Sequence, residues 1–194
     1  MQTTESQRSG RKALTIDDLQ GFEIPIREVT PEEMLSTRVA RYDKLVFPAD
    51  RYPDSLLPGH QRKNILVIGT GLIIEGGKDP MSAIPISEGY TMSYVEARPG
   101  NGPILHNHDT LESFIAIHGT WRVIWGVNEE HSLDLNPLDV CACPPFVPRR
   151  FINLTPGEGR EEGLLITVQA GNHPKAEWIH RDADGNFFGK TQRG

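Results

Sequence analysis

Two histidines and a glutamate lie close together in the segment PGNGPILHNHDTLESFIAIHG, residues 99–119. They are His106, His108 and Glu112, and two imidazoles with one carboxylate form a ligand set for a borderline transition metal. Residues two positions apart on a β-strand point to the same face, whereas on an α-helix they diverge by about 200°. A strand would therefore direct both histidines at one site. The three residues together predict a metal centre.

Short apolar or alternating stretches bounded by turn residues follow one another along most of the chain. Gly and Pro are abundant, at 19 and 15 residues, and this composition favours many short strands joined by turns. Closely spaced strands of this kind predict an all-β sandwich or barrel. The segments 112–117 and 120–127, separated by His118 and Gly119, predict a hairpin. The other predicted strands are residues 64–68, 90–98, 140–143, 149–153 and 164–168.

The N-terminal part of the chain carries a helical pattern. Residues 30–45, TPEEMLSTRVARYDKL, begin with a capping threonine, a proline and two glutamates, all of which are favourable at a helix start. Met34, Val39 and Tyr42 lie near one stripe, so we expect the helix to pack on the main body or on a partner subunit. We expect residues 1–59 to form a tail and an arm that contains this short helix.

Charge and hydropathy limit the partners and the compartment. The 194-residue chain has a formal net charge of −6, which gives no reason to expect nucleic acid or an anionic membrane as a partner. The longest apolar run, residues 65–74, is broken by glycines and is too short to cross a bilayer. The N-terminus lacks the apolar core of a secretory signal, so we expect a cytoplasmic protein. Cys141 and Cys143 are then reduced core residues.

The segment with the candidate ligands resembles the first motif of the cupin superfamily. That motif is Gly, five residues, His-x-His, three or four residues, Glu, six residues and Gly. Its fixed places are taken by Gly100, His106, His108, Glu112 and Gly119. The resemblance covers about residues 60–171 and implies an antiparallel jelly-roll β-barrel with a metal and a substrate inside. Residues 172–194 are then a C-terminal extension.

The second motif of the family is matched less completely. It normally runs Gly-Asp, four residues, Pro-x-Gly, two residues, His, three residues and Asn. The stretch LDVCACPPFVPRRFIN aligns with it on Asp139, Pro144 and Asn153. Leu138 and Phe146 replace its two glycines, and Arg149 replaces its metal-binding histidine. Arginine stays protonated and has no free acceptor, so residue 149 cannot ligate a cation.

Three interpretations of the missing histidine stay open. In the first, the three ligands of the first motif hold the metal alone, and Arg149 binds an anionic group of the substrate. In the second, a thiolate of Cys141 or Cys143, or a histidine from elsewhere in the chain, is a fourth ligand. In the third, the metal is lost and Arg149 forms a buried ion pair with Glu112 in a pocket that only binds a ligand.

The resemblance implies a metal-binding cupin, and we expect a mononuclear non-haem dioxygenase of a small organic substrate that bears a carboxylate or an enolate. His106, His108 and Glu112 would bind the metal, and Arg149 the substrate. Fe(II) is the favoured cofactor, while Mn, Ni, Co or Zn suit the same ligands. A metal-dependent isomerase or lyase and a small-molecule-binding cupin without turnover are the alternatives. Cupins commonly pair, so we expect a homodimer in which the arm is an exchange element.

Overall fold

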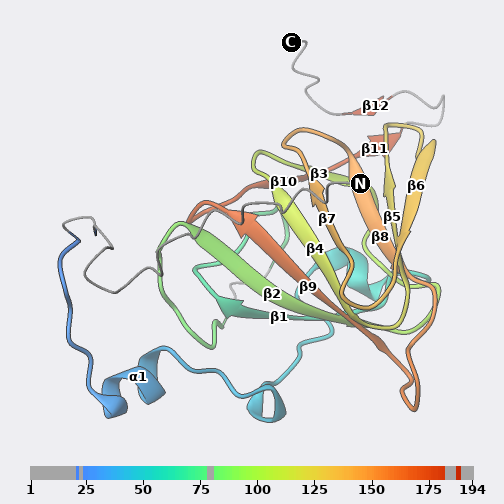
Figure 1. The fold of residues 1–194 in the computed structure, drawn as a ribbon. Helices are drawn as coiled ribbons and strands as arrows, with labels where there is room; N and C mark the ends of the chain where they lie inside the picture. Colours follow the sequence, from blue (N-terminus) through green and yellow to red (C-terminus); the bar gives the residue numbers. More distant parts are fainter. Residues whose placement is uncertain (1–20, 22–23, 78–80, 182–186, 189–194) are drawn as a thin grey trace, which may run out of the picture.

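The computed structural model describes residues 21, 24–77, 81–181 and 187–188. Two five-stranded antiparallel sheets form a barrel of the jelly-roll type (Figure 1). One sheet has the strand order β1-β2-β9-β4-β7, and the other has the order β10-β3-β8-β5-β6. The predicted all-β class, with an N-terminal arm that carries a short helix, is therefore confirmed. The beginning of the predicted tail, residues 1–20, lies outside the described residues.

The strands follow the predicted segments closely. The first sheet consists of β1 (Lys63–Ile68), β2 (Tyr90–Ala97), β9 (Gly163–Ala170), β4 (Glu112–His118) and β7 (Val140–Cys143). The second consists of β10 (Ala176–Trp178), β3 (His106–His108), β8 (Arg149–Asn153), β5 (Trp121–Trp125) and β6 (His131–Leu135). A separate ribbon pairs β11 (His180–Arg181) with β12 (Phe187–Phe188). Sequence reasoning missed β6 and β10, which are short and mostly not buried.

The interior of the barrel has an apolar part and a polar part. Alternate residues of a strand face inward, so that β4 directs Glu112 and Phe114 inward and β8 directs Arg149 and Phe151 inward. The rings of Phe114 and Phe151 lie 5.3 Å apart, centroid to centroid. On each strand, the polar inward residue therefore lies two residues before an aromatic residue of the apolar core. That core consists of Val95, Ala97, Phe114, Ala116, Trp121, Val123, Leu135, Cys143, Phe151 and Leu165.

The predicted hairpin of residues 112–117 and 120–127 was wrong, although both strands exist. β4 pairs with β7 and β9, whereas β5 pairs with β6 and β8 in the other sheet. Gly119 lies at the corner between them with φ +76°, and a Cβ there would meet the carbonyl oxygen of Thr155 at 1.8 Å. The tight glycine corner therefore passes the chain from one sheet to the other instead of folding it back on itself.

The predicted helix of residues 30–45 is shorter in the structure. α1 spans Pro31–Thr37, and Thr30 caps it by accepting a hydrogen bond from the amide of Glu33, as predicted. Its last turn contains Ser36 and Thr37, whose hydroxyls donate to backbone carbonyl oxygens one turn back, and such bonds weaken a helix. The rest of the arm has 3₁₀ turns at Tyr42–Lys44 and Pro53–Leu56.

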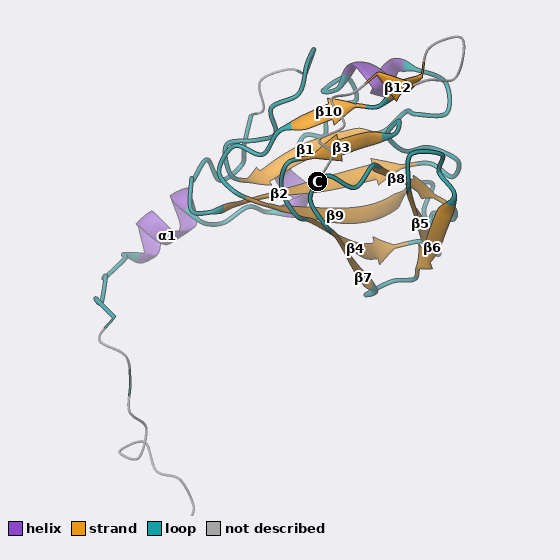
Figure 2. Ribbon diagram, turned by 90° about the horizontal axis from the view of Figure 1, so that it is seen from above, coloured by secondary structure: helices purple, strands orange, loops and turns teal. Residues whose placement is uncertain are grey.

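The expected packing of α1 on the main body is not observed. None of its residues is buried, and Figure 2 shows it beside the barrel, beyond β1 and β2. Met34, which was expected to face the body, is 45% exposed. The contact between arm and barrel is made later in the chain, where Tyr42 packs on Tyr94 of β2 with ring centroids 5.8 Å apart.

The two residues that replace glycines of the second motif keep the backbone conformation of glycine. Leu138 has φ +76° and Phe146 has φ +64°, a left-handed conformation that costs a side chain with a Cβ about 1–2 kcal/mol. Their side chains are 79% and 60% exposed, so packing does not offset this cost. The turns on either side of β7 are therefore strained.

We expect Leu138→Gly to stabilise the protein by about 0.5–1 kcal/mol, because the released strain exceeds the entropy that glycine adds to the unfolded chain. The midpoint of urea unfolding should rise accordingly. Leu57→Gly is the matched control, because Leu57 is also exposed but has φ −83°. That change should destabilise the protein. Equal effects of the two substitutions would contradict the interpretation of strain at Leu138.

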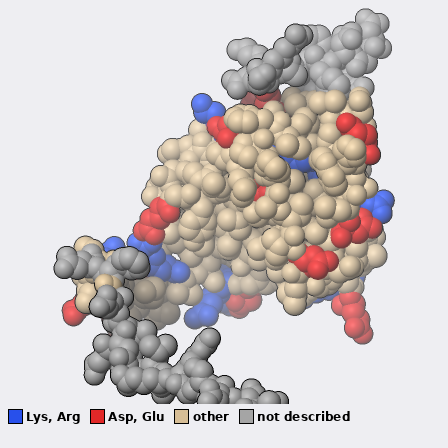
Figure 3. Space-filling model, turned by 45° about the horizontal axis from the view of Figure 1, so that its top comes forward, with Lys and Arg blue, Asp and Glu red and all other residues tan. Residues whose placement is uncertain are grey.

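The surface of the molecule is of mixed charge on the face that Figure 3 shows. Acidic and basic side chains lie there singly or in small groups among uncharged residues. Within the described ranges, no helix has the length and apolar character that a membrane crossing requires.

Candidate metal centre

The three candidate ligands of the first motif meet inside the barrel. His106 and His108 both face inward from β3, as predicted for a strand, and Glu112 faces inward from the start of β4. One ligand atom from each residue lies within 4.8 Å of the others. The three residues are only 6%, 2% and 4% exposed. Because β3 and β4 belong to different sheets, the cluster spans the interior of the barrel.

The ring of His106 is held in one tautomer. Its Nδ1 lies 2.8 Å from the carbonyl oxygen of Ile104, to which it can only donate a proton. Nε2 then carries a free lone pair. A backbone carbonyl that accepts from the second nitrogen of a ligating histidine is a common support of metal centres. His106 is therefore oriented as a ligand through Nε2.

His108 has a buried ring nitrogen without a hydrogen bond. Nδ1 lies 2.8 Å from the amide nitrogen of Gln169 and 3.3 Å from the carbonyl oxygen of Lys175. Nε2 has no hydrogen-bond partner and lies 3.4 Å from Oε2 of Glu112. When Nδ1 donates to Lys175, two lone pairs face each other across this distance, and a cation between them would satisfy both. The residues therefore fit a metal ion for two reasons. Their side chains are of the ligating type, and Nε2 of His108 has no other partner.

Arg149 lies against the candidate ligands and is fully buried. Its Nε donates to Oε2 of Glu112 at 3.3 Å, and its Nη1 donates to the carbonyl oxygen of Val147 at 3.1 Å. Nη2 is buried without a partner. The ion pair of the third interpretation is thus present, and it occurs together with the convergence of the three ligand atoms. Residue 149 pairs in register with His106, which explains its closeness to the cluster.

Burial controls the protonation of the cluster. It lowers the pKa of His106 to about 3, with a further contribution from the positive charge of Arg149. The pKa of His108 is held well below its usual value by burial, by His106 and by Arg149. Burial raises the pKa of Glu112, and Arg149 opposes this shift. Both imidazoles are therefore neutral at pH 7 and available to a metal.

The depressed pKa of His106 predicts a loss of stability in acid for the metal-free protein. The unfolded chain takes up this proton below about pH 6.5, whereas the folded chain takes it up only near pH 3. The contribution of His106 to the free energy of unfolding is therefore fully present above pH 6.5 and decreases as the pH falls toward 3. In excess chelator, the free energy of unfolding should decrease more steeply on acidification for the wild type than for His106→Gln. Parallel pH curves for the two proteins would contradict the shift.

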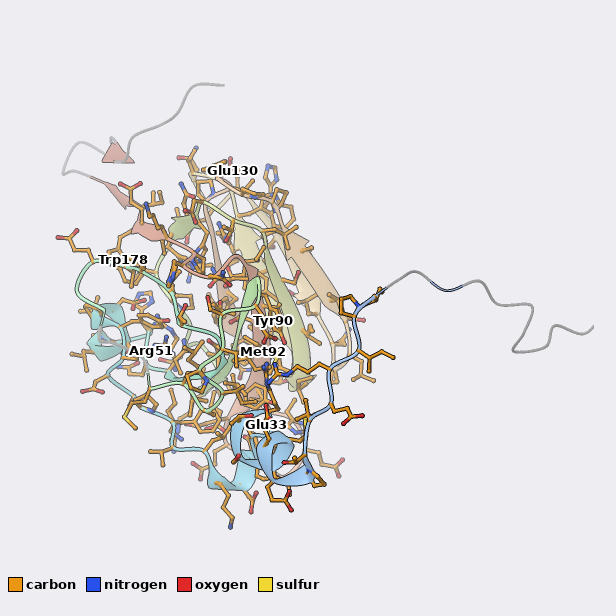
Figure 4. The ribbon with its side chains drawn as sticks, turned by 90° about the vertical axis from the view of Figure 1, so that its left-hand side faces the viewer. Glu33, Arg51, Tyr90, Met92, Glu130 and Trp178 are labelled. Carbon is orange, nitrogen blue, oxygen red and sulfur yellow. The ribbon has the colours of Figure 1, made fainter. Side chains whose placement is uncertain are left out.

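The candidate ligands line a cavity in the polar part of the barrel. In the view of Figure 4, Trp178 and Arg51 lie toward one side of the molecule, and Glu33 of α1 lies at its lower end. Trp178 of β10 lines the cavity, and its ring centroid lies 6.2 Å from that of His106. Arg149 is not among the lining residues. Besides the three ligands, the wall includes Tyr52, Arg62, Asn64, Phe151, Gln169 and Trp178.

Other predicted candidates take no part in the cluster of ligand atoms. Cys141 and Cys143 are free thiols. Cys143 faces inward opposite Glu112 in the register of β4 and β7, yet its sulfur is outside the group of atoms within 4.8 Å. The described histidines of the second interpretation are outside this group as well. Among the described residues, the cluster therefore has three members and not four.

Several residues of the site were missed by sequence reasoning. Gln169 on β9 contacts His108, and Tyr52, Arg62 and Asn64 line the cavity from the arm and the start of β1. Gln169 lies at an inward position of β9, one residue past the end of the predicted strand 164–168, so the two-residue period continued by one step would have indicated it. Tyr52 and Arg62 lie outside regular strands, and local pattern contains no information about their distance from the histidines.

Comparisons with known proteins concern the fold. No family model and no curated protein matches the sequence. The polyketide cyclase RemF from Streptomyces resistomycificus has a TM-score of 0.51 at 16% identity, over 77% of this chain and 89% of that protein. A cupin 2 domain-containing protein from Halorhodospira halophila has a TM-score of 0.48 at 15% identity, over 64% and 72%. A cupin 2 conserved barrel domain protein from Rhodopseudomonas palustris gives 0.44 at 14%, over 65% and 70%.

Proposed function

We propose that this chain, which has the cupin fold, is a mononuclear non-haem metal-dependent dioxygenase of a small organic substrate that bears a carboxylate or an enolate. The observation that supports the proposal most directly is the convergence of two neutral imidazoles and a carboxylate on one buried point, where Nε2 of His108 lacks a partner. His106, His108 and Glu112 would hold the metal. The donor set suits Fe(II) best, and it also suits Mn, Ni, Co or Zn.

The bound metal would supply redox chemistry and open coordination positions for O₂ and substrate. The residues of the chain orient and shield this chemistry. Ile104 keeps Nε2 of His106 free of its proton. The amide of Gln169 would turn its oxygen toward His108 and accept a proton from Nδ1, which leaves Nε2 for the metal. Phe151 and Trp178 line the cavity with apolar surface that excludes water.

Arg149 has two proposed roles. It holds Glu112 in place through Nε, which donates to Oε2, the same carboxylate oxygen that faces Nε2 of His108. Its predicted contact with an anionic group of the substrate stays a prediction, for which Nη2 is the unpartnered atom.

Oxygen uptake tests the proposed reaction. Protein loaded anaerobically with Fe(II) is mixed with aerated buffer that contains pentane-2,4-dione or a dihydroxybenzoate, and an oxygen electrode records consumption. We expect substrate-dependent uptake by the Fe(II) form, with little uptake by the Zn(II) form or by His106→Ala. Product formation without O₂ uptake would instead indicate Lewis-acid chemistry, as in an isomerase, a lyase or a cyclase.

A binding protein without turnover is the second candidate, and the buried Arg149–Glu112 pair favours it. An arginine beside the carboxylate competes electrostatically with a dication. In this case the purified protein would hold a small molecule tightly, contain no stoichiometric metal and consume no oxygen with the same compounds. Elemental analysis and mass spectrometry of protein purified without chelators or a histidine tag separate the two candidates.

We also propose a homodimer, because the arm leaves several large apolar side chains exposed in the single chain. Sedimentation equilibrium of the full-length protein tests this assembly, and Leu35→Glu should weaken it. A monomer at all concentrations would contradict the proposal. The exposed apolar residues of the arm are Ile24, Ile26, Met34, Leu35 and Val46.

A further inference from the structure

A second buried charged group lies at the wall of the cavity, outside both motifs. Nη2 of Arg62 donates to Oδ1 of Asp54 at 2.8 Å, and these two side chains are only 3% and 2% exposed. The other carboxylate oxygen of Asp54 accepts from the amide of Ile104 at 3.1 Å. Both oxygens of Asp54 are thus used. This pair fixes the arm against the segment that leads into β3.

Arg62 and Asn64 each keep a polar atom without a partner. Nη1 of Arg62 donates to the carbonyl oxygen of His60 at 3.1 Å, and Nη2 is used by Asp54, but Nε is buried with no hydrogen bond. Oδ1 of Asn64 is also buried without one. Buried polar groups in folded proteins are almost always paired, so each exception points to a missing partner. Here Nε of Arg62 lacks an acceptor, and Oδ1 of Asn64 lacks a donor.

Both of these residues line the cavity that contains the candidate ligands. Arg62 lies near enough to His106 for its charge to contribute to the low pKa of that histidine. Its guanidinium carbon is 5.6 Å from the centroid of the Tyr52 ring, another lining group. A ligand in the cavity would therefore have Arg62, Asn64 and the histidines among its neighbours.

The buried charges of the described residues favour an anion. Three arginines, Arg51, Arg62 and Arg149, are buried, whereas the buried carboxylates are those of Asp54 and Glu112. Because Arg62 pairs with Asp54 and Arg149 with Glu112, the charge without a buried counterion is that of Arg51, which lies on the Tyr52 ring behind the cavity wall. A divalent metal would add to this excess. A ligand with a carboxylate would offset it.

We propose that Arg62 and Asn64 form the substrate-anchoring subsite of this cavity, and that its ligand is a small 2-hydroxycarboxylate. The carboxylate accepts from Nε of Arg62, and the neighbouring hydroxyl donates to Oδ1 of Asn64. This inference rests on the proposed function and narrows its substrate class. It assigns to Arg62 the role that the sequence predicted for Arg149, because Arg62 lines the cavity and Arg149 does not.

Binding to the metal-free protein tests the subsite independently of catalysis. The ¹H–¹⁵N correlation of the arginine Nε–H groups is recorded in excess chelator, and the Arg62 signal is assigned by its loss in Arg62→Lys. The probes are glycolate, acetate, which lacks the hydroxyl, and glycolamide, which lacks the charge. We expect glycolate to shift the Arg62 signal in a saturable titration. Acetate should bind about tenfold more weakly, as the loss of one hydrogen bond in a buried site predicts. Glycolamide should cause no shift.

Substitutions separate the two contacts. Arg62→Lys can keep the ion pair with Asp54 but lacks the Nε–H donor, so it should weaken the binding of glycolate by about tenfold or more. Because the Arg62 signal is absent in this variant, the binding is followed by the other signals that glycolate shifts. Asn64→Leu should lower the affinity for glycolate to that for acetate, and it should leave the affinity for acetate unchanged. Arg51→Lys is the matched control, because Arg51 is buried on the same ring of Tyr52, with its guanidinium carbon 5.2 Å from the centroid, but does not line the cavity. It should alter glycolate affinity by less than about twofold.

Three results would overturn the subsite: an unmoved Arg62 signal at saturating glycolate, equal losses in Arg62→Lys and Arg51→Lys, or glycolate binding that depends on Arg149 and not on Arg62. If Arg62→Lys does not fold, two other variants replace it in the test. The double substitution Asp54→Asn with Arg62→Gln removes both charges of the buried pair together, and Asn64→Leu leaves the pair intact. Glycolate binding that persists in His106→Ala would support the subsite even if the chain takes up no metal. Failure of the proposed enzyme and failure of this subsite are thus distinguishable.

Discussion

A chain with His106→Ala is expected to keep its fold and to lose its bound metal. His106 is one of three ligand atoms that converge, and loss of a mere supporting hydrogen bond at a metal centre already reduces affinity by about 10–100-fold. Loss of a ligand should exceed this and reduce affinity by more than about 100-fold. Competition with a chromophoric chelator measures the change, and elemental analysis after dialysis gives the metal content per chain.

His118→Ala is the matched control, because His118 lies at the end of β4, partly buried and outside the cluster. It should keep the metal content of the wild type. Equal metal content in wild type and His106→Ala would show that the three residues do not form the site, and the proposed enzyme would then be wrong.

Arg149→His is expected to have the opposite effect and to raise metal affinity by about tenfold or more. The change removes a positive charge that lies 3.3 Å from Glu112 and adds an imidazole at a position in register with His106. Both changes favour a dication, and a tenfold gain corresponds to about 1.4 kcal/mol. The same chelator competition measures it. The affinity for glycolate should change little if Arg62 anchors the carboxylate, and it should decrease markedly if Arg149 does.

Arg150→His is the control for this substitution. Arg150 is the next residue along β8, pairs with Glu129 and points away from the barrel interior. A histidine there should leave the metal affinity unchanged. Unchanged or weaker metal binding by Arg149→His would indicate that the inward position of residue 149 does not reach the ion.

The sequence contained enough information for the class of fold and for the candidate ligands. Burial alternates along β4 and β8, where Phe114 and Phe151 face inward, because the orientation of successive residues is a local property of a strand. His106 and His108 were correctly placed on one strand face for the same reason. Glu112 followed from its spacing in a motif that resembles the cupin pattern.

The features that were not predictable depend on contacts between distant segments. The corner at Gly119 has the local pattern of a hairpin, and only the pairing of β4 and β5 with strands distant in the sequence shows that it joins two sheets. The pair of Arg62 with Asp54 and the cavity wall at Asn64 depend on how the arm meets the barrel. The helix stripe predicted a packed face for Met34, but α1 has no neighbour to pack on within the described chain.

The division of the candidate ligands between β3 and β4 has a consequence for how the protein would acquire a metal ion. Neither sheet alone holds all three groups, so a partly folded chain with one formed sheet would bind metal weakly. Capture of the ion should come late, after the two halves have closed, and escape of the ion should require them to separate. Ion at about a hundredfold excess over its dissociation constant would then add about 2.7 kcal/mol to the cost of opening. Resistance to proteolysis would become a direct measure of metal supply.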